Sequence, residues 1–310
     1  MLSSFQSQKK RRELNEKLIK SALIFAAAIS ILTTFGILFS ILFEAVEFFK
    51  LRSFWYFLTG TEWTPGTANS KFGALPIFAG TFVITIIALL VAIPIGLGSA
   101  IYMSEYASPR LRDYLKPILE VLAGIPTVVY GFFAAITVAP FVVKAANFFG
   151  LDATFNSALA SGVVMGIMII PLVSSLSDDV IRAVPDSQRK AAFGLGMTHG
   201  ETIKNIVLPS AMPGIISACL LALSRALGET MIVVMAAGLR PNLSINPLED
   251  MTTVTVTIVN SLVGDFEFNS PETLSAFALG LVLFIVTLIL NMISLSLIRK
   301  FKEKYKVNTL

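Results

Sequence analysis

Six long apolar runs decide in which solvent this chain folds. Crossing the hydrocarbon of a membrane takes about 20 apolar residues in a helix, and every run is longer. Five runs contain no charged residue and one contains two; they lie at 21–43, 72–104, 121–143, 153–177, 273–298 and 205–239. Hydrophobic residues make up 55% of the 310 and charged residues 14%, a balance foreign to soluble domains. The sequence therefore predicts an all-α polytopic membrane protein with six transmembrane helices.

Lysine and arginine are distributed unevenly between the loops. If the N-terminus is cytosolic, the inner segments hold 18 of the 24: six before the first run, three after the second, four in 178–208 and five after Ile298. Positively charged loops stay on the cytosolic side of a membrane. We predict a cytosolic basic N-terminus at 1–20, a six-helix domain at 21–298 and a cytosolic basic C-terminus at 299–310. The basic tails then mark topology in the lipid, and no nucleic-acid partner is expected.

Residues that the chain lacks exclude several kinds of chemistry. Cys219 is the single cysteine and His199 the single histidine, so an internal disulfide and a His/Cys zinc site are both excluded. No glycine is followed by lysine, so the phosphate-binding loop of common ATPases is absent. The longest segments outside the runs are about 30 residues, shorter than an independent domain. We expect no catalytic residue, no metal and no cofactor in this chain.

A helix-breaking string, AGIPT at 123–127, lies within the third run. Proline removes a backbone donor and glycine allows close approach, so such a site kinks a helix or admits tight packing. Ordinary packing is one interpretation. In the other, Thr127 and Tyr130 beside the break line a polar route through the membrane.

Two outer segments carry weaker signals. Trp55, Tyr56 and Trp63 are expected to anchor the chain at the membrane interface, where such rings collect. The threonine-rich segment 251–263 is apolar but too short to span, and we predict a short outer helix or gate lying on the membrane surface.

The inner segment 178–208 differs from an ordinary connection. Ala191, Ala192 and Gly196 are small, and their spacing of up to five positions predicts one close-packing helical face. About ten residues after Gly196 the chain reads Ile-x-Leu-Pro, with Ile206, Leu208 and Pro209. Such a face can pack against a partner protein or, alternatively, against the helices of its own bundle.

The string RALGETM at 225–231 places two charges inside the run 205–239. At 1.5 Å per residue from Pro213, Arg225 lies about 18 Å deep, near the middle of the bilayer. An arginine there costs about 2.5 to 3.5 kcal/mol on insertion scales, so it needs polar partners. In a continuous helix Glu229, at i+4, would lie on the same face and neutralise or orient the guanidinium.

Two interpretations of this pair are open. As a buried ion pair it would join helices, although such pairs often stabilise no more than apolar replacements do. As part of a route, Arg225 would offer planar, always charged donors to an oxyanion crossing the membrane. Glu229 would then keep the arginine oriented and prevent the anion from binding too tightly to leave.

The motif of segment 178–208 resembles the coupling loop of ATP-binding-cassette importer permeases, which docks into a groove of the ATPase subunit. The family usually begins this motif with glutamate, where this chain has Lys190. The resemblance implies the architecture of a type I ABC importer permease, MetI-like, and assigns ATPase coupling to the residues Lys190, Ala191, Ala192, Gly196, Ile206, Leu208 and Pro209. It also implies that ATP and Mg are bound by a separate ATPase chain.

A narrower resemblance covers nearly the whole chain. The strings that carry it are FLTGTEW at 57–63, FGALP at 72–76, SEYASPRLR at 104–112, LAGIPTVVYGF at 122–132, IRAVP at 181–185 and RALGETM at 225–231. In order and spacing they are similar to the phosphate-specific permease of the PstC type. This implies a phosphate importer in the bacterial inner membrane that works by alternating access. Its implied partners are a homologous permease of the PstA type, two ATPases of the PstB type and a phosphate-binding protein of the PstS type.

Other functions stay open on the residues alone. An arginine cannot separate phosphate from other oxyanions such as sulfate and molybdate. A secondary anion transporter or channel could use the same Arg225–Glu229 pair without any ATPase. An intramembrane enzyme is disfavoured because the runs lack a paired-aspartate or Ser/His arrangement.

Overall fold

The structure is a computed structural model that describes residues 2–66, 69–263, 267 and 269–304, with side chains described from Asn15 to Lys300. Its α-helices are α1 (Leu2–Leu51), α2 (Phe54–Thr59), α3 (Leu75–Ile101), α4 (Pro109–Ala123), α5 (Thr127–Phe133), α6 (Ala139–Phe148), α7 (Ala158–Arg182), α8 (Asp186–Gly194), α9 (His199–Thr202), α10 (Leu208–Leu227), α11 (Met231–Ala236), α12 (Val254–Val263) and α13 (Pro271–Lys304). Three π-helical turns, η1 (Tyr102–Tyr106), η2 (Ala134–Val138) and η3 (Ile203–Val207), adjoin α3, α5 and α10. Strands β1 (Trp63–Thr64) and β2 (Lys71–Phe72) pair antiparallel, with Trp63 opposite Phe72.

Six helical stretches in the described residues are long and apolar enough to cross a membrane, which confirms the predicted number. They are Asn15–Leu51, Leu75–Tyr106, Thr127–Phe148, Ala158–Arg182, His199–Leu227 and Pro271–Lys300. The chain is therefore a multi-pass membrane protein.

Two predicted boundaries differ from the structure. The basic stretch at 1–20 lies on α1, which begins at Leu2. The third span begins at Thr127 and not at 121, because Pro126 ends the preceding turn and α4 is a separate amphipathic helix. The span predicted at 205–239 is broken after Leu227.

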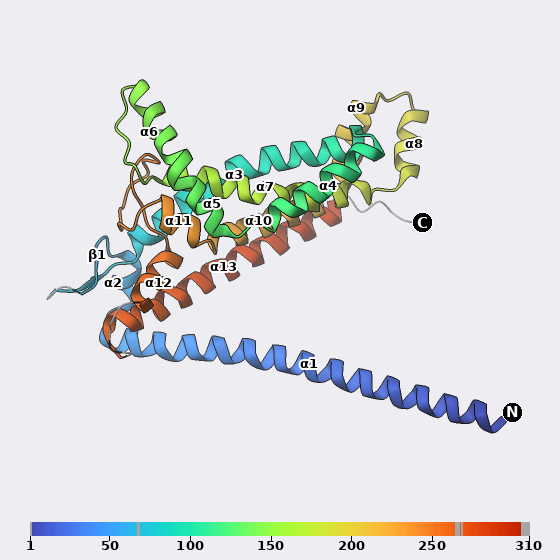
Figure 1. The fold of residues 1–310 in the computed structure, drawn as a ribbon, viewed down its shortest axis with the longest axis horizontal. Coiled ribbons are helices and arrows are strands. Elements are labelled where there is room, and N and C mark those ends of the chain that lie inside the picture. The colour runs from blue at the N-terminus through green and yellow to red at the C-terminus, as the bar shows by residue number, and fades with distance from the viewer. Residues whose placement is uncertain (1, 67–68, 264–266, 268, 305–310) are drawn as a thin grey trace.

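Helices α3 and α7 form the central pair of a bundle that also contains α10 and α13 (Figure 1). Glycines let the pair approach closely: a Cβ on Gly162 would lie 2.7 Å from Ile87 Cγ2, and one on Gly166 would lie 2.7 Å from Val91 Cβ. A Cβ on Gly96 would lie 2.8 Å from Val173 Cβ. Larger side chains at these three positions would push the backbones apart, so α3 and α7 are joined along most of their length.

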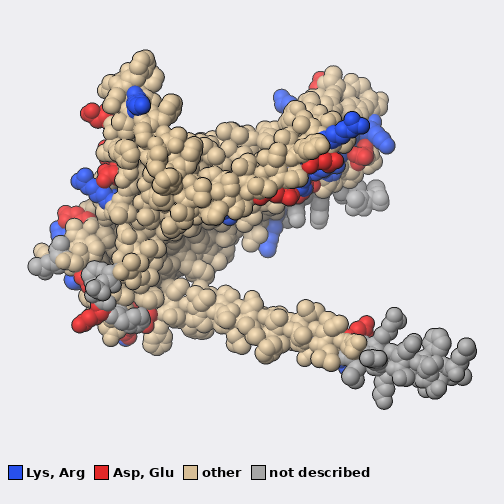
Figure 2. Space-filling view, in the orientation of Figure 1, with Lys and Arg blue, Asp and Glu red and all other residues tan. Residues whose placement is uncertain are grey.

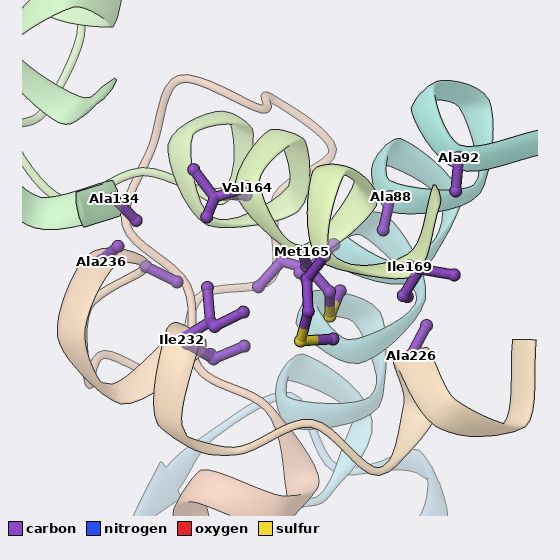
Figure 3. Close-up of a cluster of buried hydrophobic side chains, with 14 of the residues drawn as sticks. Ala88, Ala92, Ala134, Val164, Met165, Ile169, Ala226, Ile232 and Ala236 are labelled. Carbon is purple, nitrogen blue, oxygen red and sulfur yellow. The ribbon is translucent and has the colours of Figure 1, made fainter. Parts of the chain in front are cut away.

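The main core joins this pair to the helices around the break. Figure 3 shows Ala88 and Ala92 of α3 and Met165 and Ile169 of α7, with Ile232 of α11 and Ala226 of α10 approaching them. All of these side chains are at most 4% exposed. Side chains from both sides of the α10–α11 connection therefore pack densely against α3 and α7.

A second core of aromatic side chains closes one end of the molecule. Trp63 is 6% exposed and packs edge to face on Phe72, which in turn packs on Phe48 of α1. The prediction that Trp63 is an interfacial anchor is therefore wrong, because the β1–β2 ribbon turns its ring inward. Trp55 is 73% exposed, as an anchor requires. The predicted short helix exists as α12, which packs on α13 and buries Val254, Val256, Thr257 and Ser261.

The two ends of the molecule differ from its middle. Figure 2 shows Lys, Arg, Asp and Glu gathered toward the two ends, with a broad uncharged region between them. Figure 1 places the first residues of α1 at the same end as α8, α9 and the last turns of α13. Helix α1 diverges from the bundle, and its apolar side chains are exposed along most of its length, including Leu23, Phe25 and Leu32.

Candidate functional site

The candidate site is the break between α10 and α11. Helix α10 ends at Leu227, Gly228 follows as its C-cap, and α11 starts at Met231. Gly228 keeps a right-handed backbone conformation, with φ of −91°, so the interruption does not require a left-handed glycine. The apolar run at 205–239 concealed this interruption, since hydropathy does not report where the backbone hydrogen bonds stop.

Glu229 lies inside the break and does not pair with Arg225. Its carboxylate Oε1 accepts hydrogen bonds from the backbone N–H groups of Met231 (3.1 Å) and Ile232 (3.4 Å), and the residue is 8% exposed. The predicted i+4 pair on one helical face is therefore wrong, because the helix ends between the two residues. The carboxylate instead satisfies donors at the start of α11, which have no partner within that helix.

Arg225 occupies the last turn of α10 at mid-height in the bundle. Its neighbour Ala226 packs in the same core as Ala88 and Ile169, which lie midway along α3 and α7 (Figure 3). The Arg225 side chain is exposed, and the ion pairs of the described residues do not include it. A guanidinium at this height cannot remain against lipid without a large free-energy cost. Another polar surface must therefore cover this face of the bundle.

Two of the other predicted route residues, Thr127 and Tyr130, lie on α5. The Tyr130 hydroxyl donates to the carbonyl oxygen of Leu122 (2.9 Å), across the break at Gly124–Pro126. Thr127 is the first residue of α5, one turn before Tyr130. Thr127 and Tyr130 therefore share one short helix that begins directly after the break at Gly124–Pro126.

Close packing holds α5 against α11. A Cβ on Gly131 would lie 2.8 Å from Met235 Sδ and 3.1 Å from the carbonyl oxygen of Met231. The small residue after Tyr130, Gly131, therefore sets the distance between α5 and α11.

Sequence reasoning missed one contributor to the break, Thr255 of α12. Its hydroxyl donates to the Glu229 carbonyl oxygen (2.8 Å), while the backbone N–H of Val254 donates to the hydroxyl of Thr81 on α3 (3.0 Å). Helix α12 is thereby attached both to the break and to α3. The threonine-rich string had marked this segment as a gate, but only the tertiary contacts select Thr255.

The predicted coupling loop forms two short helices at the end opposite the aromatic core. Ala192 of α8 is 3% exposed, whereas Lys190 and Ala191 are exposed. Gly196 does not share the face of the two alanines, because α8 ends at Gly194 and Gly196 has φ of +83°. Its N–H donates to Phe193 O and the Met197 N–H to Ala192 O, a left-handed helix end that glycine favours.

The second half of the predicted motif belongs to the following helix. Ile206 lies in η3, and Leu208 and Pro209 open α10; all three are partly buried against the bundle. They therefore connect the loop to the helix that carries Arg225. Two exposed apolar side chains that sequence reasoning missed, Phe193 (45% exposed) and Leu195 (83% exposed), project from the loop.

At the opposite end, the loop after α11 is fixed to the start of α7 by Glu249. Its carboxylate accepts from the side-chain amides of Asn242 (2.7 Å) and Asn246 (3.1 Å), and its carbonyl oxygen accepts from the Ala158 N–H (3.0 Å). Hydrogen bonds from Asn242, Ser244 and Asn246 lower the pKa of the Glu249 carboxyl below its ordinary 4.5. The contribution of this carboxylate to loop order is therefore complete above about pH 4.5 and lost as the pH falls through the lowered pKa.

A nitroxide at Ile245→Cys, in a Cys219→Ala background, should report this loss. Ile245 is 89% exposed, so the label reports loop motion. We expect its mobility to increase as the pH falls through the lowered pKa of Glu249. In Glu249→Gln the loop should be mobile at all pH values, because the charged acceptor is gone. A mobility step at the same pH in Glu249→Gln would assign the transition to another group.

Comparison with known proteins identifies the family of this chain. The model of the family "Binding-protein-dependent transport system inner membrane component" matches residues 92–306. This chain therefore belongs to that family of membrane transport components. A bacterial ABC transporter for import of the acidic polysaccharide alginate has a similar fold, with a TM-score of 0.62 at 16% identity, covering 93% of this chain and 99% of that one. A chain of the MetNI methionine ABC transporter has a TM-score of 0.53 at 15% identity, covering 74% and 94%. These likenesses confirm the predicted type I importer architecture.

Relatives in sequence are more specific. The "Phosphate transport system permease protein PstC" of Mesorhizobium japonicum is 36% identical and covers 86% of this chain and 84% of its own. "PstC 1" of Mycobacterium tuberculosis is 32% identical over 83% and 85%. "Probable ABC transporter permease protein YqgH" of Bacillus subtilis is 35% identical over 81% and 78%. Family membership makes the chain a non-catalytic permease that works with separate ATPase and binding-protein partners, which disfavours the secondary-transporter and enzyme alternatives.

Proposed function

We propose that this chain is the PstC-type permease subunit of an ATP-driven, binding-protein-dependent phosphate importer. The observation that carries the proposal is the guanidinium of Arg225, exposed at mid-height of the bundle and absent from the ion pairs of the described residues. Planar guanidinium donors suit the geometry of a phosphate oxyanion. Relatives that are named phosphate permeases support the choice of anion.

Half of the translocation route then belongs to this chain and half to a homologous permease of the PstA type. The sister subunit would cover the face that exposes Arg225, which satisfies the guanidinium without burying it in lipid. Thr127 and Tyr130 on α5 would line the same route. Glu229 holds the start of α11 in place, so the anion meets an arginine with no fixed carboxylate partner.

ATP and Mg would be bound by two separate ATPase subunits of the PstB type, below the end that carries α8 and α9. That end is cytosolic in this proposal, together with both termini, because it carries the basic segments. A phosphate-binding protein of the PstS type would deliver phosphate to the opposite, outer end. Alternating access follows when ATPase closure moves α8 and α9 and the bundle opens alternately to the two sides of a bacterial inner membrane.

Coupling-loop docking makes a separate prediction at Leu195. This side chain is 83% exposed on the proposed cytosolic end, as expected of a residue that enters a groove of the ATPase. Leu195→Asp should lower co-purification of the ATPase about tenfold, because an exposed apolar anchor at a contact centre contributes most of the binding energy. Ile245→Asp, equally exposed at the outer end, is the control and should leave co-purification unchanged. If both variants lose ATPase co-purification equally, the substitutions act on folding of the permease and not on the docking contact.

Competition between oxyanions tests the choice of cargo. Complexes reconstituted in vesicles with ATP inside and the phosphate-binding protein outside are expected to take up labelled phosphate, and excess sulfate or molybdate should leave that uptake unchanged. Uptake that sulfate or molybdate suppresses, or that persists without the ATPase, would contradict the proposal.

A further inference from the structure

Arg189 of α8 contacts two other elements, η1 and the end of α7, at the proposed cytosolic end. Its guanidinium forms an ion pair with Glu105 of η1 (2.9 Å), at the end of α3. It also donates to the carbonyl oxygens of Ile181 (3.0 Å) and Val184, at the end of α7. The planar, five-donor fork of arginine can reach three acceptors at once, which a lysine ammonium on its flexible stem does less well.

Burial makes these contacts strong. The Arg189 side chain is 16% exposed and that of Glu105 is 5% exposed, so water screens their attraction little. A second carboxylate, Asp186, lies 3.3 Å from the same guanidinium but is 82% exposed. Exposed pairs contribute little, so Glu105 is the effective partner and Asp186 offers a matched control.

The same end of α3 holds the second helix of the loop. The His199 ring nitrogen Nε2 lies 3.2 Å from the Glu105 carbonyl oxygen, and the His199 ring packs edge to face on Tyr106, with 5.1 Å between ring centroids. On its other side the ring stacks on Phe193 of α8. Both helices of the loop are therefore attached to η1, α8 through Arg189 and α9 through His199.

We propose that Arg189 is a positioning residue that joins the coupling loop to α3 and α7, so that displacement of α8 moves this pair and, through the main core, the α10–α11 break. This inference rests on the proposed function, which makes 178–208 the ATPase-coupling loop. Glycine contacts join α3 to α7, and Ile232 and Ala226 pack against both on the two sides of the break. Without Arg189, movement of α8 is absorbed at the Val184–Pro185 connection.

The test is the number of anions imported per ATP hydrolysed by the assembled complex in vesicles. Glu105→Gln removes the ion pair, and Arg189→Lys keeps the charge but loses simultaneous contact with the α7 carbonyls. Both are expected to lower this ratio about tenfold, within the usual range of coupling free energies, while hydrolysis changes less than about twofold. Asp186→Asn should leave the ratio unchanged.

Three results would overturn the inference: an unchanged ratio in both variants, uptake and hydrolysis that fall in parallel, or loss of complex assembly in both variants. A parallel fall would mean that the residue serves ATPase docking or activity and not transmission. If phosphate is not the transported anion, the complex without substitutions will not import it. The number of anions imported per ATP would then be measured with the anion that this complex does import. Failure of the inference appears only in the comparison of variants with that complex.

Discussion

Arg225→Ala is expected to lower phosphate uptake by about 100-fold in reconstituted complexes, while the permease still inserts and assembles. A factor of this size corresponds to about 3 kcal/mol, the scale of one or two charge-assisted hydrogen bonds to the passing anion. Assembly should survive because the Arg225 side chain is exposed and takes part in no ion pair of the described residues, so its removal leaves no buried carboxylate without a partner.

Two further variants sharpen this prediction. Arg225→Lys keeps a positive charge but not the planar fork, so uptake should be intermediate. Arg52→Ala removes an exposed arginine that lies over the Phe72 ring, away from the route, and should transport normally. Measured uptake of labelled phosphate that is unchanged in Arg225→Ala would remove Arg225 from the route.

Arg112→Ala is expected to destabilise the protein by about 3 to 5 kcal/mol, the range measured when one partner of a buried ion pair is removed. Arg112 of α4 lies 2.7 Å from the Asp178 carboxylate of α7, and the Asp178 side chain is 1% exposed. Removing the arginine leaves that carboxylate buried without a counter-charge. The free energy of unfolding, followed by denaturant titration in detergent, measures the loss.

The adjacent pair on the same two helices supplies the control. Lys116 lies 2.6 Å from Asp179, whose side chain is 53% exposed, so Lys116→Ala should cost about 1 kcal/mol or less. The double variant Arg112→Ala/Asp178→Ala should recover about half of the loss, because no charge is then left unpaired. Equal destabilisation by Arg112→Ala and Lys116→Ala would show that the burial of Asp178 does not increase the contribution of the Arg112–Asp178 pair to the free energy of unfolding.

The corrected position of Glu229 changes the meaning of the RALGETM string. In a continuous helix Glu229 would neutralise Arg225, and the anion would compete with a fixed carboxylate. In the structure that carboxylate is engaged by the N–H groups of Met231 and Ile232. Under the proposed function, the arginine is therefore available to a moving anion, and Glu229 stabilises the break beside it.

The sequence by itself determined the membrane class and the six spans, and it selected the candidate functional segments, because each of these depends on local composition. Long apolar runs can only be satisfied in hydrocarbon, and an arginine inside such a run has few uses. The same local signal placed Thr127, Tyr130 and the 178–208 loop among the candidates.

Only the tertiary structure decided how those residues face one another. The break after Leu227 depends on Glu229 reaching the α11 amides and on Thr255 of α12 holding the Glu229 carbonyl, contacts that hydropathy does not encode. Likewise, Gly196 ends α8 where small-residue spacing predicted a shared face, and Arg189 finds Glu105 across 84 residues of sequence. Hydropathy reports the solvent that a residue prefers. Hydrogen-bond partners depend instead on which helices lie close together, and the close approach of α3 and α7 is set by their glycines.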